Sequence, residues 1–268
     1  MNVYHTTRPD WVDKVQDLKP GQHRRIADGR RASFNGKGYF LWDFREQTGE
    51  VWEPQLSLSE KLEAMAAVNA AGWEAASTTA QPEPRMYHLK DWPSEARVWL
   101  HQASLSNHDI LNINAYWNSR INRVVLPYTT LMGQSAWIAR AVLPGTGPKY
   151  LFPRGISRGG GALVSGDPHT KKVVITEDLL SAYRVSWATG MDAVAAQGTS
   201  LDRSAQAIIA TQYREAFVWL DPDGPGIRGA KEISRSLGAF DIPVNRVNSE
   251  RDPKLLTDEA ILLLIGKG

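Results

Sequence analysis

The chain has 268 residues, of which 42% are hydrophobic, and its formal net charge is only +2. A chain of this length can bury one large core or two small ones. It contains no cysteine and no run of 18 apolar residues, which excludes disulfides, thiolate zinc sites and a membrane-spanning helix. Residues 1–14 lack the apolar core of a signal peptide, so we expect a soluble, cytoplasmic protein without a membrane partner. Because the net charge is small, a polyanionic partner would have to be bound by a local basic patch.

Residues 1–76 are predicted to form a small β-ribbon followed by a helix. Aromatic residues alternate between glycines in the first part, a pattern typical of short strands. Two serines that can cap a helix precede an alanine-rich run and predict a helix over residues 57–76. Basic residues crowd positions 19–37, where they could bind a nucleic-acid template or form an ordinary solvated surface.

Residues 77–87 are polar and contain prolines, so we expect a linker there and the main domain boundary. Residues 88–170 are then predicted to form a mixed α+β subdomain. Its predicted elements are a helix over 93–105, strands over 121–130 and 136–145, and a glycine-rich loop over 154–166.

From residue 171 to residue 268 the sequence alternates between buried strands and amphipathic helices. The predicted strands are 171–176, 192–196, 217–220 and 242–247, and the predicted helices are 179–190, 200–213 and 225–238. Gly190 and Gly238 are expected to end the first and third of these helices. This alternation implies an α/β fold with a parallel sheet and right-handed crossovers, within a chain that is α+β overall.

Acidic residues follow two of these predicted strands. Glu177 and Asp178 come after the first strand, and Asp221 and Asp223 come after the third. Residues i and i+2 of an extended segment project to the same side, and Pro222 stiffens the segment between the two aspartates. Carboxylates gathered at one sheet edge repel one another unless cations neutralise them, and Mg²⁺ or Mn²⁺ prefers such oxygen ligands. The pattern therefore favours a metal site for phosphoryl or nucleotidyl transfer.

Two other interpretations of the same stretch stay open. Gly224, Gly226 and Gly229 spell the G-x-G-x-x-G of a dinucleotide-binding loop, but they follow the third strand rather than the first. That motif also requires an acidic residue about 20 positions later, where Asn245 and Arg246 stand. Alternatively, the aspartates only cap a turn and the helix behind it. We favour metal, with the glycines allowing close packing.

Three stretches together resemble the TOPRIM domain of primases, topoisomerases and some nucleases: "KKVVITEDLLSAY", "WLDPDGPGIRGA" and "RVNSERDPKLL". The family pattern is a strand followed by Glu-Gly, then Asp-x-Asp opening a helix. Residues 123–151 resemble the core that precedes TOPRIM in DnaG-type and phage primases. The resemblance covers about residues 88–260 and favours a stand-alone DNA primase of the phage or prophage type. It implies a Rossmann-like TOPRIM sheet for residues 171–268.

The resemblance also implies an activity and its partners. Such a primase makes short RNA primers from nucleoside triphosphates on single-stranded DNA, and it works with a separate replicative helicase in phage DNA replication. Glu177, Asp221 and Asp223 would be the catalytic residues and would bind Mg²⁺ or Mn²⁺. Asp252 would stand beside them as a further acidic residue.

Two positions of the acidic motif depart from the family pattern. Asp178 stands where the family has glycine, which adds a charge at the turn. Ser181 stands where an acidic residue is common. These departures leave the three expected metal-binding positions in place.

Basic residues upstream match the family's nucleic-acid-binding positions. Arg123, Arg140 and Lys149 would line a groove that faces the acidic site, unless they are ordinary surface charges. Arg154 and Arg158 flank the glycine-rich loop and would contact the triphosphate. Lysines and arginines suit this role because they bind phosphates.

The N-terminal segment has the rhythm of a primase zinc ribbon without its cysteines, so we expect no zinc there. It resembles a ribbon that has lost its metal and is held by its aromatic residues; an unrelated β-hairpin is the alternative. We expect Trp42 and Trp52 to be the most exposed tryptophans, able to stack on bases. Two further functions remain open: a TOPRIM nuclease that uses the same acidic residues, and a non-catalytic subunit that binds single-stranded DNA or a helicase.

Overall fold

The computed structural model describes residues 2–5, 8–35, 38–46, 48–52, 58–143 and 146–266. Its contacts divide the chain into two compact units, which we describe separately. The first unit comprises Met1–Trp99, Asn107–Leu126 and Trp137–Arg154, and the second comprises Leu100–Ser106, Pro127–Ala136 and Gly155–Gly268. No helix among the described residues is long and apolar enough to cross a membrane.

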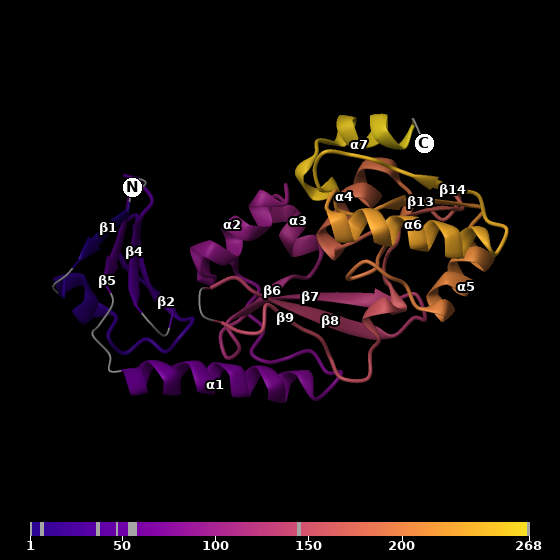
Figure 1. The fold of residues 1–268 in the computed structure, drawn as a ribbon. Helices are drawn as coiled ribbons and strands as arrows, with labels where there is room; N and C mark the ends of the chain where they lie inside the picture. Colours follow the sequence, from indigo (N-terminus) through magenta and orange to yellow (C-terminus); the bar gives the residue numbers. More distant parts are fainter. Residues whose placement is uncertain are drawn as a thin grey trace. The chain divides into compact units, whose positions relative to one another are not determined.

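The first unit begins with a five-stranded sheet, which is larger than the expected ribbon (Figure 1). Its strands, in spatial order, are β1 (Asn2–His5), β5 (Thr48–Trp52), β4 (Tyr39–Asp43), β3 (Arg30–Phe34) and β2 (His23–Ala27). Only β1 and β5 pair in parallel; the other neighbours are antiparallel.

One face of this sheet carries a small core. The short 3-10 helix η1 (Asp10–Lys14) and the turn after it contribute Trp11, Val12, Val15 and Leu18. The ring of Tyr39 stacks on Phe34 and Trp52, with ring centroids 4.5 and 5.8 Å apart. The expected aromatic cluster is therefore present. The core also contains the aliphatic side chains of Val12, Val15 and Leu18, which the sequence analysis did not predict.

Several basic residues of the N-terminal segment are paired with acids. Arg24 makes two hydrogen bonds to Asp17, at 2.8 and 2.7 Å, and Arg30 contacts Glu50 at 2.7 Å. Lys37 lies outside the described residues. These ion pairs favour the interpretation of the patch as an ordinary solvated surface.

The expectation about exposed tryptophans was wrong. Trp42 and Trp52 are half-buried, whereas Trp73 and Trp187 are 64% and 41% exposed. Trp52 is less exposed because its ring packs on the core of the N-terminal sheet.

The rest of the first unit contains helices and antiparallel strand pairs. Its elements are α1 (Leu58–Ala76), η2 (Leu89–Asp91), α2 (Ser94–Gln102), α3 (Asn107–Asn112), β6 (Tyr116–Asn118), β7 (Arg123–Thr130), β8 (Ser135–Ala141) and β9 (Tyr150–Leu151); α2, β7 and β8 continue into the second unit. Two backbone carbonyls of the expected linker 77–87 accept hydrogen bonds from buried residues. Trp137 donates to Ala80 and Tyr116 donates to Pro82. The four predicted segments stay a prediction, but the expected linker is attached to the fold around it.

The second unit is built on a mostly parallel sheet. Its strands run in the order β14 (Val244–Arg246), β13 (Glu215–Trp219), β11 (Lys172–Thr176), β12 (Asp192–Ala195) and β10 (Ala162–Val164), followed by the end of β7. The first four strands are parallel, and β10 is antiparallel to both of its neighbours. The predicted alternation and the parallel sheet are thus confirmed. The expected glycine-rich loop 154–166 contains β10 and a short 3-10 helix, η3 (Arg158–Gly160).

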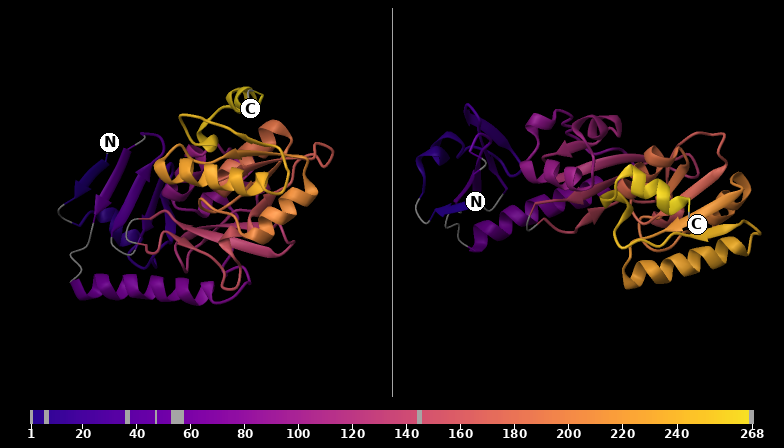
Figure 2. Two further views of the ribbon diagram at one scale, coloured as in Figure 1. Left: turned by 45° about the vertical axis from the view of Figure 1, so that its right-hand side comes forward. Right: turned by 90° about the horizontal axis from the view of Figure 1, so that it is seen from above.

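Helices cover both faces of the parallel sheet (Figures 1 and 2). Helices α5 (Arg203–Gln212) and α6 (Gly224–Gly238) pack on the face that contains Val173 and Val218. Helices α4 (Leu179–Thr189) and α7 (Asp258–Ile265) pack on the face that contains Val174 and Trp219. Successive residues of a strand point to opposite faces of the sheet. A strand that is apolar throughout therefore contributes side chains to the cores on both faces.

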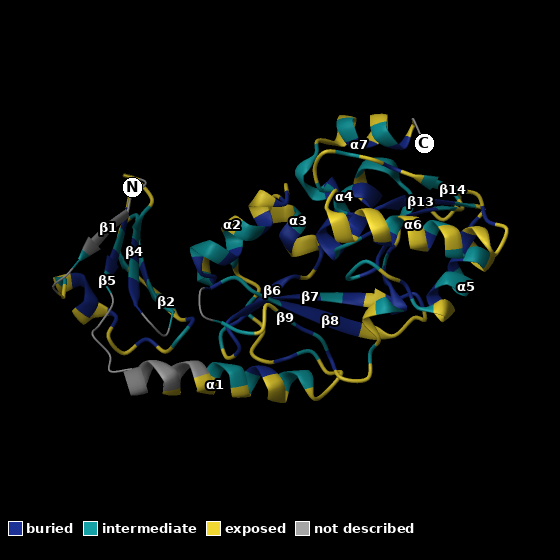
Figure 3. Ribbon diagram, viewed as in Figure 1, coloured by how far each residue is buried: buried dark blue, intermediate teal, exposed yellow. Residues whose placement is uncertain are grey.

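The two glycines that were expected to end helices behave differently. Gly190 ends α4 in the left-handed conformation, with φ 71°, as predicted. Gly238 is the last residue of α6, also as predicted, but there Ala239 caps the helix in a right-handed conformation. The prediction that this helix ends at Gly238 is therefore confirmed, although the left-handed glycine cap of α4 is not repeated there. Figure 3 shows α6 with one buried and one exposed side, as expected of a helix on a sheet face.

Candidate acidic site

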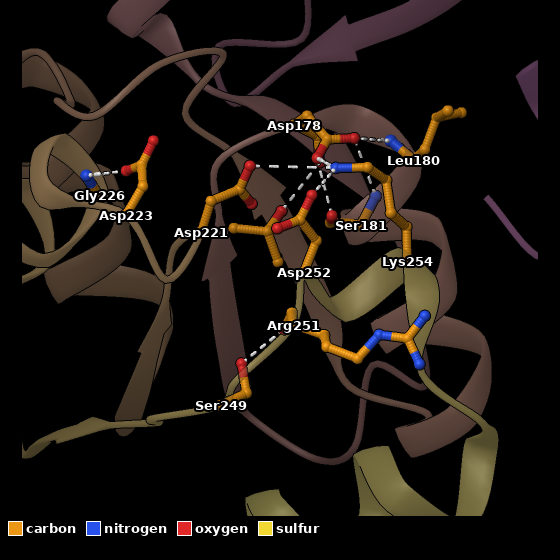
Figure 4. Close-up of polar contacts among 11 residues, drawn as sticks. Asp178, Leu180, Ser181, Asp221, Asp223, Gly226, Ser249, Arg251, Asp252 and Lys254 are labelled. Carbon is orange, nitrogen blue, oxygen red and sulfur yellow. Dashed lines mark hydrogen bonds and ion pairs between the residues drawn. The ribbon is translucent and has the colours of Figure 1, made fainter. Parts of the chain in front are cut away.

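The acidic residues gather at the carboxyl edge of the parallel sheet in the second unit. Glu177 and Asp178 follow β11, and Asp221 comes two residues after β13 ends. Since β11 and β13 are parallel neighbours, their carboxyl ends lie side by side. Asp252 joins them from the residue before the 3-10 helix η4 (Pro253–Leu255), as Figure 4 shows. This is the sheet edge where open α/β folds carry their working groups.

Lys254, which the sequence analysis did not single out, lies in the middle of these carboxylates (Figure 4). Its Nζ atom is 2.8 Å from an oxygen of Asp178, 2.8 Å from one of Asp252 and 4.0 Å from one of Asp221. Burial lowers the pKa of Lys254, but the carboxylates, Asp178 foremost, outweigh it and raise the pKa above its ordinary value. The lysine is therefore charged. In the sequence it lies two residues after Asp252.

Asp178 caps helix α4. Its Oδ1 atom accepts from the backbone N–H groups of Leu180 and Ser181, and its Oδ2 atom accepts from the Ser181 hydroxyl at 2.8 Å. The backbone of Asp178 is extended, with φ −126°, so the fold does not require glycine at this position. Asp178 and Ser181, the two departures from the expected motif, thus contact each other: Asp178 caps the helix, and the Ser181 hydroxyl donates to its carboxylate.

Asp223 caps helix α6. One carboxylate oxygen accepts from the backbone N–H of Gly226 at 2.7 Å, and the side chain is exposed. Figure 4 shows this carboxylate beside Gly226, whereas the Asp221 carboxylate points toward Lys254. The two aspartates were expected to face one point, but in this structure their carboxylates do not converge.

Two of the three motif glycines are needed for close packing. A Cβ atom on Gly226 would lie 2.1 Å from the backbone oxygen of Asp221, and one on Gly229 would lie 2.4 Å from that of Thr199. A Cβ atom on Gly224 would meet only the end of the Arg228 side chain, at 3.3 Å. These contacts favour the packing interpretation of the glycines over a dinucleotide loop.

The pKa values of two acidic side chains are raised above their ordinary values. Burial, followed by the neighbouring Asp223 and Asp178 charges, raises the pKa of Glu177. Burial likewise raises the pKa of Asp221 to about 7, and nearby carboxylates add to this against the opposing effect of Lys254. Glu177 Oε2 and Asp221 Oδ1 are buried without a hydrogen-bond partner. Both groups therefore lack a positive partner at the oxygen that faces inward.

The donor chemistry of this pair suits a divalent cation. Mg²⁺ keeps several waters and is commonly held by one or two carboxylates together with substrate phosphates. Glu177 Oε2 and Asp221 Oδ1 are unpartnered carboxylate oxygens of that kind. Among the described residues, no three acidic or histidine side chains are arranged as a complete metal-ligand set. The fit thus rests on two residues, with Asp223 engaged as a helix cap.

Arg123, expected in an open groove, is fully buried in the first unit. Its guanidinium donates to the backbone oxygens of Ile121, Gly147 and Pro148 at 2.7, 2.8 and 2.8 Å. A buried guanidinium that is bound to three carbonyls cannot line a groove, so this part of the expectation was wrong. The position is structural because it ties two segments of the unit together.

Arg140 and Lys149 lie together in the first unit with aromatic neighbours. The guanidinium of Arg140 stands 4.7 Å from the centre of the Tyr150 ring and 5.6 Å from that of Trp99. The exposed Lys149 lies 5.7 Å from the Tyr150 ring. Arg154 is also exposed in this unit, whereas Arg158 is exposed in the second unit, in η3.

Comparisons with known proteins give a likeness in structure alone. No family model and no curated protein matches the sequence. Among solved structures, the zinc-binding and RNA polymerase domains of the Aquifex aeolicus primase match with a TM-score of 0.56 and 14% identity, over 97% of this chain and 83% of that one. The DnaG catalytic core matches with a TM-score of 0.54 and 14% identity, over 76% and 79% of the two chains. The chain has a DnaG-type primase fold.

A third solved structure extends this likeness. The DnaG primase catalytic domain bound to single-stranded DNA matches with a TM-score of 0.52 and 14% identity, over 75% of this chain and 80% of that one. At such identities the primase fold is what the chains share, and the function has to be argued from the residues of the site.

Proposed function

We propose that this chain is a TOPRIM-type DNA primase that makes short RNA primers on single-stranded DNA. One observation carries the proposal: Glu177 and Asp221, from neighbouring parallel strands, each present a buried, unpartnered carboxylate oxygen at the carboxyl edge of the sheet. On a primase fold, such a pair suits divalent-cation chemistry on triphosphates.

Glu177 and Asp221 would hold Mg²⁺ or Mn²⁺, and Asp223 would add a ligand when its carboxylate leaves the helix cap. The bound cation would neutralise triphosphate charge and favour ionisation of the attacking hydroxyl group. Asp221, with a pKa of about 7, releases its proton from the carboxyl group as the cation binds. Asp178 and Asp252 keep Lys254 in place beside it.

The basic residues would bind the substrates. Arg140 and Lys149, with the rings of Tyr150 and Trp99, combine phosphate-binding charge with stacking surfaces, which is the composition of single-strand binding sites. We propose the same phosphate-binding role, toward nucleoside triphosphates, for Arg154 and Arg158. From the resemblance to phage and prophage primases, we also propose that the protein acts in phage DNA replication in the cytoplasm. There it would work with a separate replicative helicase.

A second candidate is a non-catalytic primase-like subunit that binds single-stranded DNA or a helicase. The observation in its favour is that Lys254 neutralises part of the acidic cluster while Asp223 is used as a cap. In that case the ion pairs of Lys254 with Asp178 and Asp252 would stabilise the fold and would have no role in catalysis.

One assay separates these functions. The full chain is incubated with single-stranded DNA, Mg²⁺ and labelled ribonucleoside triphosphates. Labelled oligomers support a primase, whereas fragments of the template indicate a nuclease. A change in template mobility without either product indicates the binding subunit.

The matched variants are Asp221→Asn and Asp241→Asn. The first removes a proposed ligand oxygen and should lower synthesis more than about 100-fold. The second makes the same chemical change at an exposed residue with φ 61°, a conformation that asparagine tolerates, and should leave synthesis unchanged. Near-normal synthesis by Asp221→Asn would overturn the proposed site.

A further inference from the structure

Lys254 has no catalytic part in the chemistry proposed above, yet its ammonium group contacts several carboxylates of the acidic cluster. Its side chain is 21% exposed and reaches three carboxylates that come from three segments of the second unit: Asp178, Asp221 and Asp252. A surface lysine would keep its ammonium group in water, where it is well hydrated. Here the ammonium group is held inside the cluster instead.

Asp221 is shared between two environments. Its Oδ2 atom lies 4.0 Å from the Lys254 ammonium, whereas its Oδ1 atom is buried and has no hydrogen-bond partner. In some sites for two cations, one carboxylate bridges the ions by binding one with each oxygen. Asp221 resembles such a ligand, because one oxygen faces an ammonium group and the other has no partner. In such sites the two ions stand about 3.5–4 Å apart and share ligands. Glu177, which follows the neighbouring strand β11, also has a buried carboxylate oxygen without a hydrogen-bond partner.

The charges on the two sides of Asp221 are unequal. Lys254 contributes one positive charge against the two carboxylates of Asp178 and Asp252, both at 2.8 Å. Glu177 Oε2 and Asp221 Oδ1, by contrast, are buried and have no hydrogen-bond partner. One divalent ion could bind to the unpartnered oxygens of Glu177 and Asp221. Another divalent ion, close to the Lys254 ammonium group, would be repelled by its positive charge.

We propose that Lys254 takes the place of a second divalent cation, so that the acidic cluster binds a single Mg²⁺ or Mn²⁺ ion. The inference deepens the proposed function and rests on it for the first ion. Lys254 is then a positioning residue that fixes how many ions the site accepts. Removing its charge would free oxygens of Asp178, Asp221 and Asp252 for another ion.

The test counts Mn²⁺ ions bound to the full chain, by titration with detection of free Mn²⁺ by electron paramagnetic resonance. We expect one ion per wild-type chain and one more per chain in Lys254→Met. Lys254→Arg, which keeps the positive charge, should bind the same number as the wild type. Lys254→Gln, which keeps N–H donors for the two close aspartates, is a second neutral variant. Circular dichroism checks that each variant is folded.

The difference between variant and wild type decides the inference. Equal ion counts in the wild type and in a folded neutral variant would overturn it. Two ions per wild-type chain would also overturn it, whether or not the neutral variants fold. An additional ion in Lys254→Met supports it even if the chain makes no primers. In that case only the proposed function fails, because the ion count does not depend on synthesis.

Discussion

The ammonium nitrogen of Lys254 lies 2.8 Å from Asp178 Oδ2, although 76 residues separate the two positions in the chain. The contact joins the turn after β11 to the 3-10 helix η4. Asp178 therefore has two tasks, since it also caps helix α4 through its other oxygen. Asp178, which stands where the resemblance expects glycine, thus binds the Lys254 ammonium group together with Asp252.

These two tasks can be separated by substitution. Asp178→Asn keeps the helix cap and loses the ion pair, whereas Asp178→Ala loses both. We expect Asp178→Ala to lower the free energy of unfolding by about 1–3 kcal/mol, and Asp178→Asn to lower it by less. Urea unfolding of the metal-free proteins measures both values. Equal stability of all three proteins would show that neither contact contributes.

The pKa of Asp221 predicts a dependence of stability on pH. Burial raises this pKa from its ordinary value of 3.8 to about 7. Between these values the native chain keeps a proton that the unfolded chain has released, so native stability falls as pH rises through this range. The slope for one such group is about 1.4 kcal/mol per pH unit. Asp221→Asn should remove this contribution in metal-free urea titrations at pH 4 to 7.

Cation binding should show the opposite dependence. Because the ion must displace the Asp221 proton, its affinity should rise about tenfold per pH unit below pH 7 and level off above it. Glu177, whose pKa is also raised, acts in the same direction. Calorimetric titration with Mg²⁺ at several pH values measures the effect. An affinity that does not change between pH 5.5 and 8 would contradict the proposed ligands.

Gly229 tests the packing interpretation of the glycine motif. An alanine Cβ there would stand 2.4 Å from the Thr199 oxygen and 2.7 Å from the Thr199 Cβ, so helix α6 would have to move. We expect Gly229→Ala to lower the free energy of unfolding by about 1–3 kcal/mol. Gly238→Ala, in the same helix with nothing within 4 Å, should be neutral or stabilising by up to about 1 kcal/mol. Similar effects of the two substitutions would contradict this interpretation.

Lys149 and Arg140 test the proposed nucleic-acid surface. Each change to alanine should weaken binding of single-stranded DNA and flatten its salt dependence by roughly one counterion. Arg203→Ala, at the exposed start of α5, is the control and should do little. Fluorescence anisotropy of a labelled oligonucleotide over a series of salt concentrations measures the slopes. Equal effects of all three changes would mean that diffuse charge binds the DNA.

The second unit could be predicted well because its strands are short apolar runs and its helices have recognisable ends. Residues 172–176 and 215–219 are buried along almost their whole length, as parallel strands between two helical layers have to be. Both glycines marked helix ends: Gly190 is the left-handed residue directly after α4, and Gly238 is the last residue of α6.

The N-terminal sheet was harder to predict. Strand β2 contains two arginines and no apolar run, so periodicity did not indicate it; its pairing with β3 defines it. Lys254 was missed for a related reason. Its role depends on Asp178, which is distant in sequence, and a lysine is ordinarily a surface residue.

Arg123 would matter to the proposed DNA binding without touching DNA. Its guanidinium ties the carbonyls of Gly147 and Pro148 to Ile121, and Lys149 is the next residue along the chain. The backbone directly before the exposed Lys149 is therefore held by an arginine in the interior. If Lys149 binds DNA as proposed, loss of Arg123 would displace its charge, and a screen for lost binding would then wrongly identify the buried Arg123 as a DNA contact.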